Sequence, residues 1–455
     1  MSATEILARW SAEAPRDWPA DCLEGARRAF VDTVAVMLAG SGEPGVVATA
    51  KAVADWGAGP STAIVGGNRL PSPWAALVNG IAAHSQDYDD VLNPAMSHPS
   101  AALVPAILAL GEEVGASGAA CLDAYLVGLE VMTRLGEGMN LVHYHRGWHT
   151  TLSLGVTGVA AACGRLLGLD AHGMNMALSL STSMAGGSKR QFGSDAKPLH
   201  AGIAAKNGIV AARLAAAGVT GVTEPLEGKW GYVEITSGPD APGFAGLADR
   251  IGRPSAMAQY GIWLKYYPCC ASTHRPVDAL RALAREHALK PDAIARIDGL
   301  VSPVAAANLR FRVPENVSQA RFSLPYCLAA ALLDGTLTPA SFNEAAIRRP
   351  EALALIERIQ MAVDSNPELS ADVPVTESRE RGTVVVKLAD GRVLERIIDV
   401  PHGHPDDPLT ADELDGKFMA CAEGILAPAA ARRALDALGG VGRLNRIDLL
   451  TAVLH

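Results

Sequence analysis

Residues 201–217 read AGIAAKNGIVAARLAAA, and the only polar side chains in this stretch are Lys206, Asn207 and Arg213. Lys206 and Arg213 are seven residues apart, so on a helix they share one narrow stripe and leave the rest of the circumference apolar. A helix that is apolar around most of its surface is a buried helix. Gly218 follows directly and has the residue type that commonly ends helices. The stretch therefore predicts a buried helix within a helical core.

The same helical texture extends through the N-terminal part of the chain. Residues 152–168 and 174–185 are similarly rich in alanine, leucine and serine. Ser2 and Glu5 have the spacing of a capping box, which predicts that the first helix starts at once. We therefore expect residues 1–263 to be nearly continuous helix with short breaks.

The pattern changes after about residue 264. Strand-like alternation occurs at 295–301 and 357–363, and residues 383–400 predict a β-hairpin with Asp390-Gly391 at its turn. Helical stretches lie between these strands, near residues 276–289 and 322–334. This mixture predicts a smaller α+β domain.

The C-terminal segment returns to helical texture. Residues 401–408 are rich in proline, glycine, histidine and aspartate and predict a linker, after which Thr410 and Glu413 form a second capping box. The predicted fold class is thus mainly α with an α+β part. A large all-helical domain (1–263) is interrupted by a smaller α+β lid domain (264–400), and the linker and C-terminal helices (401–455) return to the helical domain.

The composition excludes several classes of protein. The 455 residues carry a formal net charge of −9, which gives no basic footprint for nucleic acid. No apolar run reaches the roughly 18 residues of a membrane span, and no secretory signal opens the chain. The seven cysteines are scattered and odd in number, so they do not predict a disulfide framework. We expect a cytoplasmic protein that binds neither nucleic acid nor membranes.

Four polar or ionisable residues stand beside predicted helix starts or turns, and they suggest a binding site. They are His98 before Pro99, His149 before Thr150, Lys197 before Pro198, and Lys265 ahead of Tyr267-Pro268. A helix N-terminus offers unpaired N–H groups and a partial positive charge. Several such ends gathered with histidine and lysine would bind a small di- or tricarboxylate.

Each of these candidates also has a simpler interpretation. Asp87-Tyr88-Asp89-Asp90 places carboxylates so close that one can have a raised pKa and act as an acid or base, although, taken alone, the motif favours a solvated helix end or a set of helix caps. Lys197 and Lys265 can pair with a carboxylate or lie along the surface. The pair Lys189-Arg190 offers further cations or plain surface charge.

Cofactor motifs are weak or absent in the sequence. His143, His145 and His149 resemble a metal box, but no carboxylate or cysteine completes it nearby, and adjacent Cys269-Cys270 does not have cluster spacing. No dinucleotide-binding, phosphate-binding or serine-hydrolase motif occurs. These observations argue against a local metal site, an iron–sulfur cluster and a nucleotide cofactor.

Taken together, the motifs resemble those of the MmgE/PrpD family along essentially the whole chain. They occur in the family's order as HSQDYDD (84–90), HPS (98–100), GWHTT (147–151), KPLHAG (197–202), KYYPCC (265–270), FSLPY (322–326) and DPLT (407–410). This resemblance implies a helical domain with an α+β lid, a homodimer, and no required metal or cofactor. The family includes 2-methylcitrate dehydratases, cis-aconitate decarboxylases and iminodisuccinate epimerases.

The resemblance also assigns the site. It implies Asp87, His98, His149, Lys197 and Lys265 as catalytic residues, with Arg190, His274 and Tyr326 as substrate-binding residues. Val91 departs from the pattern, because dehydratase and decarboxylase members usually carry a threonine after the aspartate cluster. A lost hydroxyl removes one substrate hydrogen bond.

We expect a lyase of the dehydratase type that acts on a small di- or tricarboxylate. His98 or His149 would handle the proton on the carbon beside a carboxylate, Lys197 and Lys265 would neutralise negative charge, and Asp87 would orient a histidine or act as an acid. Epimerisation and decarboxylation are the alternatives. A terpene cyclase would need an aromatic-walled cavity, which 5% aromatic residues do not favour, and a non-catalytic helical scaffold would scatter these side chains.

Overall fold

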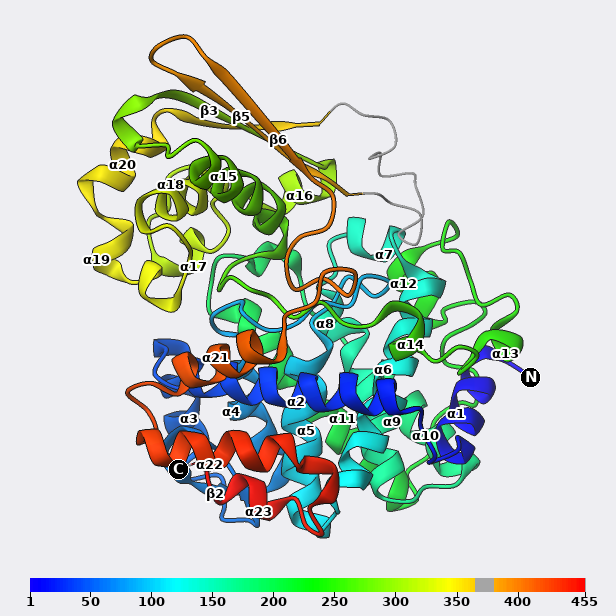
Figure 1. The fold of residues 1–455 in the computed structure, drawn as a ribbon. Coiled ribbons are helices and arrows are strands. Elements are labelled where there is room, and N and C mark those ends of the chain that lie inside the picture. Colours follow the sequence, from blue (N-terminus) through cyan, green and yellow to red (C-terminus); the bar gives the residue numbers. More distant parts are fainter. Residues whose placement is uncertain (365–379, 455) are drawn as a thin grey trace.

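The computed structural model describes residues 1–364 and 380–454, and most of the described chain is helical (Figure 1). The helices of the first part are α1 (Ala3–Glu13), α2 (Ala20–Gly40), α3 (Pro44–Val53), α4 (Ser72–His84), α5 (Pro99–Val114), α6 (Gly118–Met139), α7 (Val142–His145), α8 (Thr150–Ser153), α9 (Gly155–Leu166), α10 (Ala171–Thr182), α11 (Ala196–Ala216), α12 (Tyr232–Ser237), α13 (Leu247–Arg250) and α14 (Ala256–Tyr260). The C-terminal helices α21 (Ala411–Ala422), α22 (Pro428–Gly439) and α23 (Asp448–Thr451) lie beside α2 and α5.

The buried helix predicted at 201–217 is confirmed as α11, which packs against α4, α5 and α9. Glycines let α4 and α11 approach closely. A Cβ on Gly80 would lie 2.7 Å from Cα of Gly202, and a Cβ on Gly202 would lie 2.4 Å from the carbonyl oxygen of Leu77. Gly218 follows α11 with φ +90°, as a helix-ending glycine does. This close packing fixes the helix that carries Lys197 and His200.

The expectation of nearly continuous helix up to residue 263 is wrong in two places. Residues 217–246 contain only one helix, α12, because glycine and proline recur through this segment. A short antiparallel pair, β1 (Ser61–Thr62) and β2 (Arg69–Leu70), also lies within the helical part. Both capping boxes, Ser2 with Glu5 and Thr410 with Glu413, are confirmed.

The α+β part contains a four-stranded sheet. Its strands are β3 (Ile294–Val301), β4 (Ile359–Val363), β5 (Gly382–Leu388) and β6 (Val393–Ile398), in the order β4-β3-β5-β6. β3 pairs parallel with β4 and antiparallel with β5, and β5 pairs antiparallel with β6. The predicted strands and the hairpin are therefore confirmed, and Gly391 at the hairpin turn has φ +90°.

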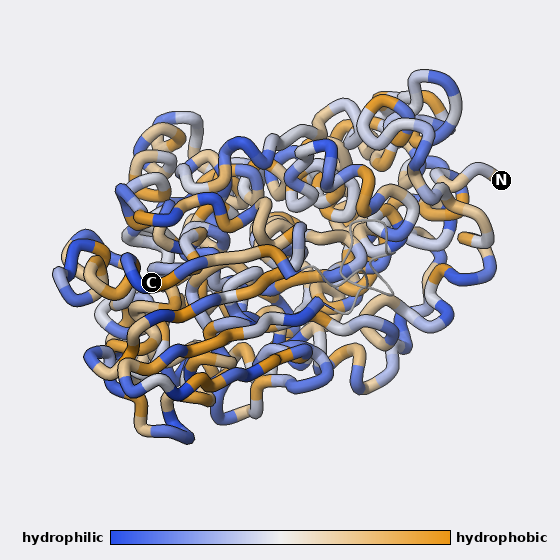
Figure 2. Tube along the Cα trace, turned by 90° about the horizontal axis from the view of Figure 1, so that it is seen from above, coloured by the Kyte–Doolittle hydropathy of each residue, from blue (hydrophilic) through white to orange (hydrophobic). Residues whose placement is uncertain are grey.

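Helices cover one face of this sheet (Figure 1). The helices that pack against the strands are α15 (His274–Glu286), α16 (Pro303–Asn308), α18 (Leu324–Asp334) and α20 (Pro350–Ile356). The short helices α17 (Val317–Ala320) and α19 (Glu344–Ile347) contact each other farther from the sheet. Hydrophobic and hydrophilic positions alternate along the strands (Figure 2), as a sheet with one packed face requires.

Two hydrophobic cores follow from this arrangement. One contains buried residues from 3 to 264 and from 409 to 454, and the other contains residues from 267 to 388 together with Phe192. The predicted fold class, mainly α with an α+β part, is confirmed. Among the described residues no single helix is long and apolar enough to cross a membrane, although the bent pair α2–α3 meets that criterion by length and composition.

Candidate active site

A cleft opens where the helical part meets the α+β part. The space enclosed within it is small, about 80 Å³, below the roughly 300–1,000 Å³ of typical small-ligand sites. The helical part contributes Val91, Asn93, Met96, Ser97, His98, Tyr144, His149, Phe192, Lys197 and Trp263, and the α+β part contributes Cys270, Ala271, Ser272, Val304, Asn308, Phe322 and Glu380. The lining thus combines an apolar wall with a few convergent polar groups.

The loop between α4 and α5 brings the aspartate cluster inside the protein. Backbone hydrogen bonds between Val91 and Trp263, at 2.8 and 2.9 Å, and between Leu92 and Ser97 hold this loop. Asp87 has φ +52°, a left-handed conformation that aspartate tolerates better than most residues. All three carboxylates are buried. The interpretation of this cluster as a solvated helix end is therefore wrong.

Asp87 joins the two lysines that the sequence singles out. Nζ of Lys197 donates to Oδ2 of Asp87 at 2.7 Å, and Nζ of Lys265 donates to Oδ1 and, at 2.9 Å, to the backbone carbonyl oxygen. Burial disfavours a charged Asp87, but the two ammonium groups outweigh it and hold its pKa well below the usual range. The same pairing raises the pKa of Lys265 against the effect of burial. The group of three therefore carries a net positive charge.

Asp89 holds two histidines. Both of its oxygens accept from Nδ1 of His84, at 2.8 and 2.9 Å, and Nδ1 of His98 lies 3.5 Å from Oδ2. Nδ1 of His98 donates to the carbonyl oxygen of Asp90 at 2.8 Å. Burial and the ammonium of Lys265 hold the pKa of His98 well below its usual range. His98 is thus neutral at pH 7, with its proton on Nδ1.

Asp90 belongs to the loop before α5, and its side chain contacts the first turn of that helix. The backbone N–H of Ser100 donates to Oδ1 at 3.1 Å, the Ser100 hydroxyl donates to Oδ2, and that hydroxyl also contacts the Tyr125 hydroxyl at 2.8 Å. Burial raises the pKa of Asp90 to about 8, and the neighbouring Asp89 adds to the shift. Asp90 is therefore the member of the cluster that holds a proton near neutral pH.

His149 precedes α8 and faces the cleft. Its Nδ1 lies 2.8 Å from Nδ1 of His200, one turn after Lys197 on α11, and its Nε2 is buried with no partner among the residues that the structure describes. Burial and the ammonium of Lys197 hold the pKa of His149 well below its usual range. A neutral imidazole with a free nitrogen can accept a proton.

The structure therefore brings the five predicted catalytic residues together. Lys197, His98 and His149 line the cleft, while Asp87 and Lys265 lie behind Lys197. These contacts show proximity and charge, and the chemical role of each residue stays a prediction.

The three residues predicted to bind substrate lie elsewhere. Arg190 is exposed on the short helix Lys189–Gln191, and it is absent from the cleft lining. Tyr326 is in the second core, where its hydroxyl donates to the carbonyl oxygen of Ser341. His274 is buried behind Trp263, with ring centroids 5.3 Å apart. The motif resemblance that assigned them did not determine which way α18 and α15 present Tyr326 and His274.

Sequence reasoning missed several residues that the structure places at the site. His84 stands in the motif HSQDYDD and His200 in KPLHAG, yet neither was assigned a role. The three-residue spacing of Lys197 and His200 on a helix was the available signal. One wall of the cleft is formed by Tyr144, Asn308 and Ser272. The Tyr144 hydroxyl donates to Asn308 at 3.1 Å, and the Asn308 amide donates to Ser272 at 3.4 Å. No pattern in the sequence indicated this wall.

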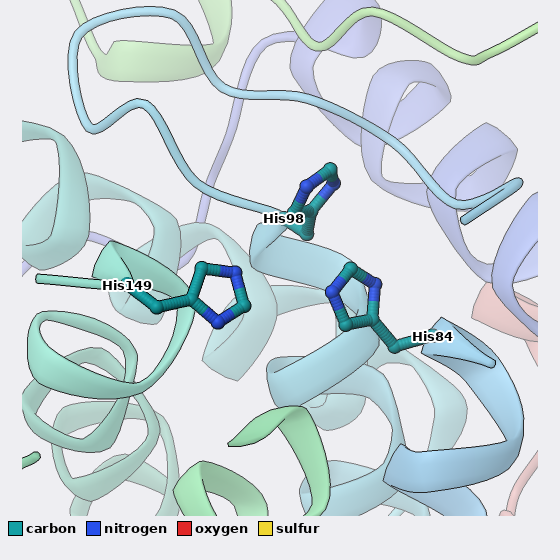
Figure 3. A group of neighbouring side chains, drawn as sticks. All are labelled: His84, His98 and His149. Atoms are coloured by element: carbon teal, nitrogen blue, oxygen red, sulfur yellow. The ribbon is translucent and has the colours of Figure 1, made fainter. Parts of the chain in front are cut away.

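His143 belongs to the weak metal motif that it forms in sequence with His145 and His149. His143 is buried, and its two ring nitrogens contact Ser237 and Ser153 at 3.1 and 2.8 Å. Instead His84, His98 and His149 each offer a ring nitrogen within 4.8 Å of the others (Figure 3). The ring planes of His84 and His149 are 20° apart with their centroids separated by 5.7 Å. Burial and the ammonium groups of Lys265 and Lys197 lower the pKa of His98, and these ammonium groups disfavour a further cation at this position.

Comparison with known proteins identifies the same family that the sequence motifs resemble. The model of the MmgE/PrpD N-terminal domain matches residues 5–245, and that of the MmgE/PrpD C-terminal domain matches residues 267–438. The chain is 32% identical over 402 residues to cis-aconitate decarboxylase of Homo sapiens, covering 85% of this chain and 80% of the relative. The Mus musculus cis-aconitate decarboxylase is 31% identical over 397 residues, with 85% and 79% covered. The cis-aconitate decarboxylase-like protein oryM of Aspergillus oryzae is 28% identical over 450 residues, with 93% and 91% covered.

Proposed function

The chain belongs to the MmgE/PrpD family, and from this membership and the geometry of the cleft we propose that it is a lyase that acts on a small di- or tricarboxylate. The reaction centre is the carbon beside a substrate carboxylate. We assign its chemistry to the residues that reach the cleft, namely His98, His149 and Lys197.

One observation carries the proposal: two neutral imidazoles and one ammonium group converge on the same cleft. Removing a proton beside a carboxylate needs a base that is unprotonated at pH 7 and a cation over the developing enediolate. Lys197 supplies the cation, and Lys265 keeps Lys197 from being fully neutralised by Asp87. The arrangement matches both requirements.

Dehydration is the reaction that this protonation state favours. His149, or His98, takes the proton from the carbon, and the electron pair of the C–H bond forms the alkene as hydroxide leaves the neighbouring carbon. The leaving hydroxide takes a proton from the imidazolium that has just formed and departs as water, which returns the histidine to its neutral state. Lys197 stabilises the negative charge on the carboxylate between these events.

Decarboxylation is the second candidate, because the curated relatives described above are cis-aconitate decarboxylases. That reaction expels CO₂ and then needs a proton for the carbon. The imidazoles would have to gain a proton when substrate binds, and the carboxylates of a bound polyanion would raise their pKa in that direction.

Proton NMR in D₂O separates these reactions on one panel of hydroxy and unsaturated di- and tricarboxylates, cis-aconitate included. Alkene formation identifies dehydration, release of CO₂ identifies decarboxylation, and deuterium wash-in without net change identifies epimerisation. Lys197→Met should abolish whichever change is seen. Absence of every change, together with no thermal stabilisation by any member of the panel, would overturn the proposal.

The classes other than lyase fit the site less well. A terpene cyclase would use the aspartate cluster to hold metal-bound diphosphate, but Asp87 and Asp89 are buried and already paired with lysine and histidine. A scaffold protein would give no reason for the five side chains to meet, and they do meet.

A further inference from the structure

Three basic residues gather beside the cleft, and the proposed chemistry uses none of them. Lys189 and Arg190 lie on the short helix Lys189–Gln191, and Arg310 follows α16 in the α+β part. The Arg310 guanidinium donates to the backbone carbonyl oxygens of Lys189 and Phe192, at 3.4 and 3.0 Å. Within residues 1–364 and 380–454, none of the three cations forms an ion pair with a carboxylate. A group of cations without counter-charge attracts anions.

Lys189 is the member of this group whose charge lies against the cleft wall. Its Nζ is 3.4 Å from the centroid of the Tyr144 ring, and Tyr144 lines the cleft. The N–H of Lys189 donates to the carbonyl oxygen of Gly147 at 2.8 Å, which fixes Lys189 beside the segment that carries His149. Lys189 is half-buried, and burial lowers its pKa to about 8. The ammonium is therefore still charged at pH 7.

The cleft wall beneath this ammonium is polar, and it joins α7 of the helical part to α16 of the α+β part (Figure 1). The Tyr144 hydroxyl donates to Oδ1 of Asn308, and Nδ2 of Asn308 donates to the Ser272 hydroxyl. The amide of Asn308 has a second hydrogen and the Ser272 hydroxyl has one, and neither donates to another group in the described part of the chain. Both can therefore donate to a carboxylate oxygen.

The carboxylate in the cleft lining does not neutralise Lys189. Glu380 pairs with Arg275 at 3.0 Å and accepts from the Ser302 hydroxyl at 3.0 Å. The other ammonium of the cleft, that of Lys197, is bound to Asp87. The cleft therefore has two ammonium groups on different segments of the chain, and the one over Tyr144 has no counter-charge among the described residues.

We propose that Lys189, together with the amide of Asn308 and the hydroxyl of Ser272, binds a substrate carboxylate distant from the reacting carbon. This rests on the proposed lyase function and adds the residues that select a second carboxylate. An ammonium over an aromatic ring keeps N–H groups that point away from the ring, and these donate to one carboxylate oxygen. Asn308 and Ser272 donate to the other oxygen. Lys197 remains the cation at the reaction centre.

The test is a calorimetric titration with two unreactive ligands of nearly equal shape, glutarate and its monoamide glutaramate. A hydrogen bond to a charged group contributes about 10- to 100-fold in affinity, so wild type should bind glutarate at least about 10-fold more tightly than glutaramate. Lys189→Met should reduce this preference to within about threefold. The matched control is Lys206→Met, because Lys206 is also half-buried, with its ammonium 5.2 Å from the Trp74 ring centroid, and lies outside the cleft lining. It should keep the wild-type preference.

Asn308→Asp is a second variant, which tests the same position without removing the lysine. Aspartate still accepts from the Tyr144 hydroxyl, but its charge repels a ligand carboxylate, so the preference for glutarate should again be lost. Thermal melting checks that each variant is folded.

Three outcomes would overturn the inference. Wild type shows no preference for glutarate, or a folded Lys189→Met or Asn308→Asp protein keeps the wild-type preference, or Lys206→Met loses the preference as fully as Lys189→Met does. None of these results touches the proposed function. That function fails separately, if wild type neither converts any member of the substrate panel nor is stabilised by one.

Discussion

Lys197 donates to Oδ2 of Asp87 at 2.7 Å across a sequence separation of 110 residues. Lys265 occupies the other carboxylate oxygen, and all three side chains are buried. Charges at this depth are tolerated only when they are paired. Asp87 therefore fixes two segments of the helical part, α11 and the chain after Trp263, to the loop that carries the aspartate cluster.

Asp87→Asn should be costly both to stability and to activity. Asparagine also tolerates the observed φ of +52°, so the change removes charge without backbone strain. Two ammonium groups would be left without their counter-charge, which typically costs about 3–5 kcal/mol. We expect that loss in urea unfolding and a fall in turnover of at least about 10²-fold. The control is Asp240→Asn, at an exposed aspartate, which should leave stability unchanged. If Asp87→Asn also keeps its free energy of unfolding within about 1 kcal/mol of wild type, well short of the expected loss, the ion-pair argument is rejected.

His149→Gln tests the proposed carbon base. General acid–base assistance is worth about 10²–10⁴-fold, so kcat should fall by at least the lower figure. The fold should persist, because the loss is confined to the contact of Nδ1 with His200, worth about 1–3 kcal/mol, whereas Nε2 makes no hydrogen bond with the residues described by the structure. Circular dichroism and thermal melting would check the fold, and His172→Gln, at an exposed histidine, is the control. Near-normal turnover in His149→Gln would leave His98 as the remaining base.

Asp90 should make stability fall as the pH rises. Its folded pKa of about 8 lies above the roughly 3.9 of an unfolded aspartate, so its contribution is complete below about pH 4 and is lost as the pH approaches 8. Buried histidines such as His143, whose pKa is lowered to about 4, act in the opposite direction between about pH 4 and 6.5. The histidines no longer contribute between about pH 6.5 and 8, but Cys269, whose pKa is lowered to about 5, acts against Asp90 through this window. The contribution of Asp90 must therefore be obtained by difference.

The measurement is the free energy of unfolding of wild type and Asp90→Asn across that window. Asparagine stays neutral, so the difference between the two proteins cancels the other titrating groups. Wild type should lose stability relative to the variant as the pH rises. Parallel curves would mean that Asp90 is already ionised at pH 6.5.

Local rules predicted much of the fold, because the signals are complete within short stretches. The apolar circumference of 201–217, the capping boxes at Ser2 and Thr410, and Asp390-Gly391 at a turn each depend on neighbours in sequence. The break at 217–246 was underestimated because glycine and proline were weighed less than the helical texture around them.

Patterns within short stretches of sequence predicted less of the site than of the fold. The order of the motifs grouped Asp87, His98, His149, Lys197 and Lys265, but it did not show that one carboxylate binds both lysines. Tyr326 was expected at the pocket because the family resemblance, through the motif FSLPY, assigned it there. On α18 its side chain turns into the second core, and helix orientation of this kind depends on long-range packing.

Val91→Thr should shift the substrate preference of the cleft. The backbone of Val91 is already bonded to Trp263 in both directions, so the substitution adds a hydroxyl to the cleft without altering the loop. A new hydrogen bond is worth about 0.5–1.5 kcal/mol, or roughly 2- to 10-fold in kcat/KM for a substrate that can use it. Steady-state comparison of cis-aconitate with the other tri- and dicarboxylates checks this. A uniform change across the panel would show that position 91 does not select among substrates.

Lys417 in α21 connects the C-terminal segment to the site. Its ammonium donates to the carbonyl oxygens of Tyr88 and Lys265, at 2.9 and 2.7 Å, and lies 2.6 Å from Oδ1 of Asp32 in α2. Lys417→Met would leave Asp32 buried without its partner, at a cost of about 3–5 kcal/mol. It would also remove the hydrogen bonds that hold the backbone at Tyr88 and at Lys265, on either side of the Asp87 ion pairs.

Adding Asp32→Asn to Lys417→Met separates these two effects. The double variant removes the unpaired charge, so it should recover at least about half of the lost stability in urea unfolding. Turnover should stay low, because the carbonyl oxygens of Tyr88 and Lys265 still lack their donor. If the double variant regains full turnover along with its stability, then Lys417 contributes only through Asp32, and the contacts to the two site segments have no part in positioning Lys265 or Asp87.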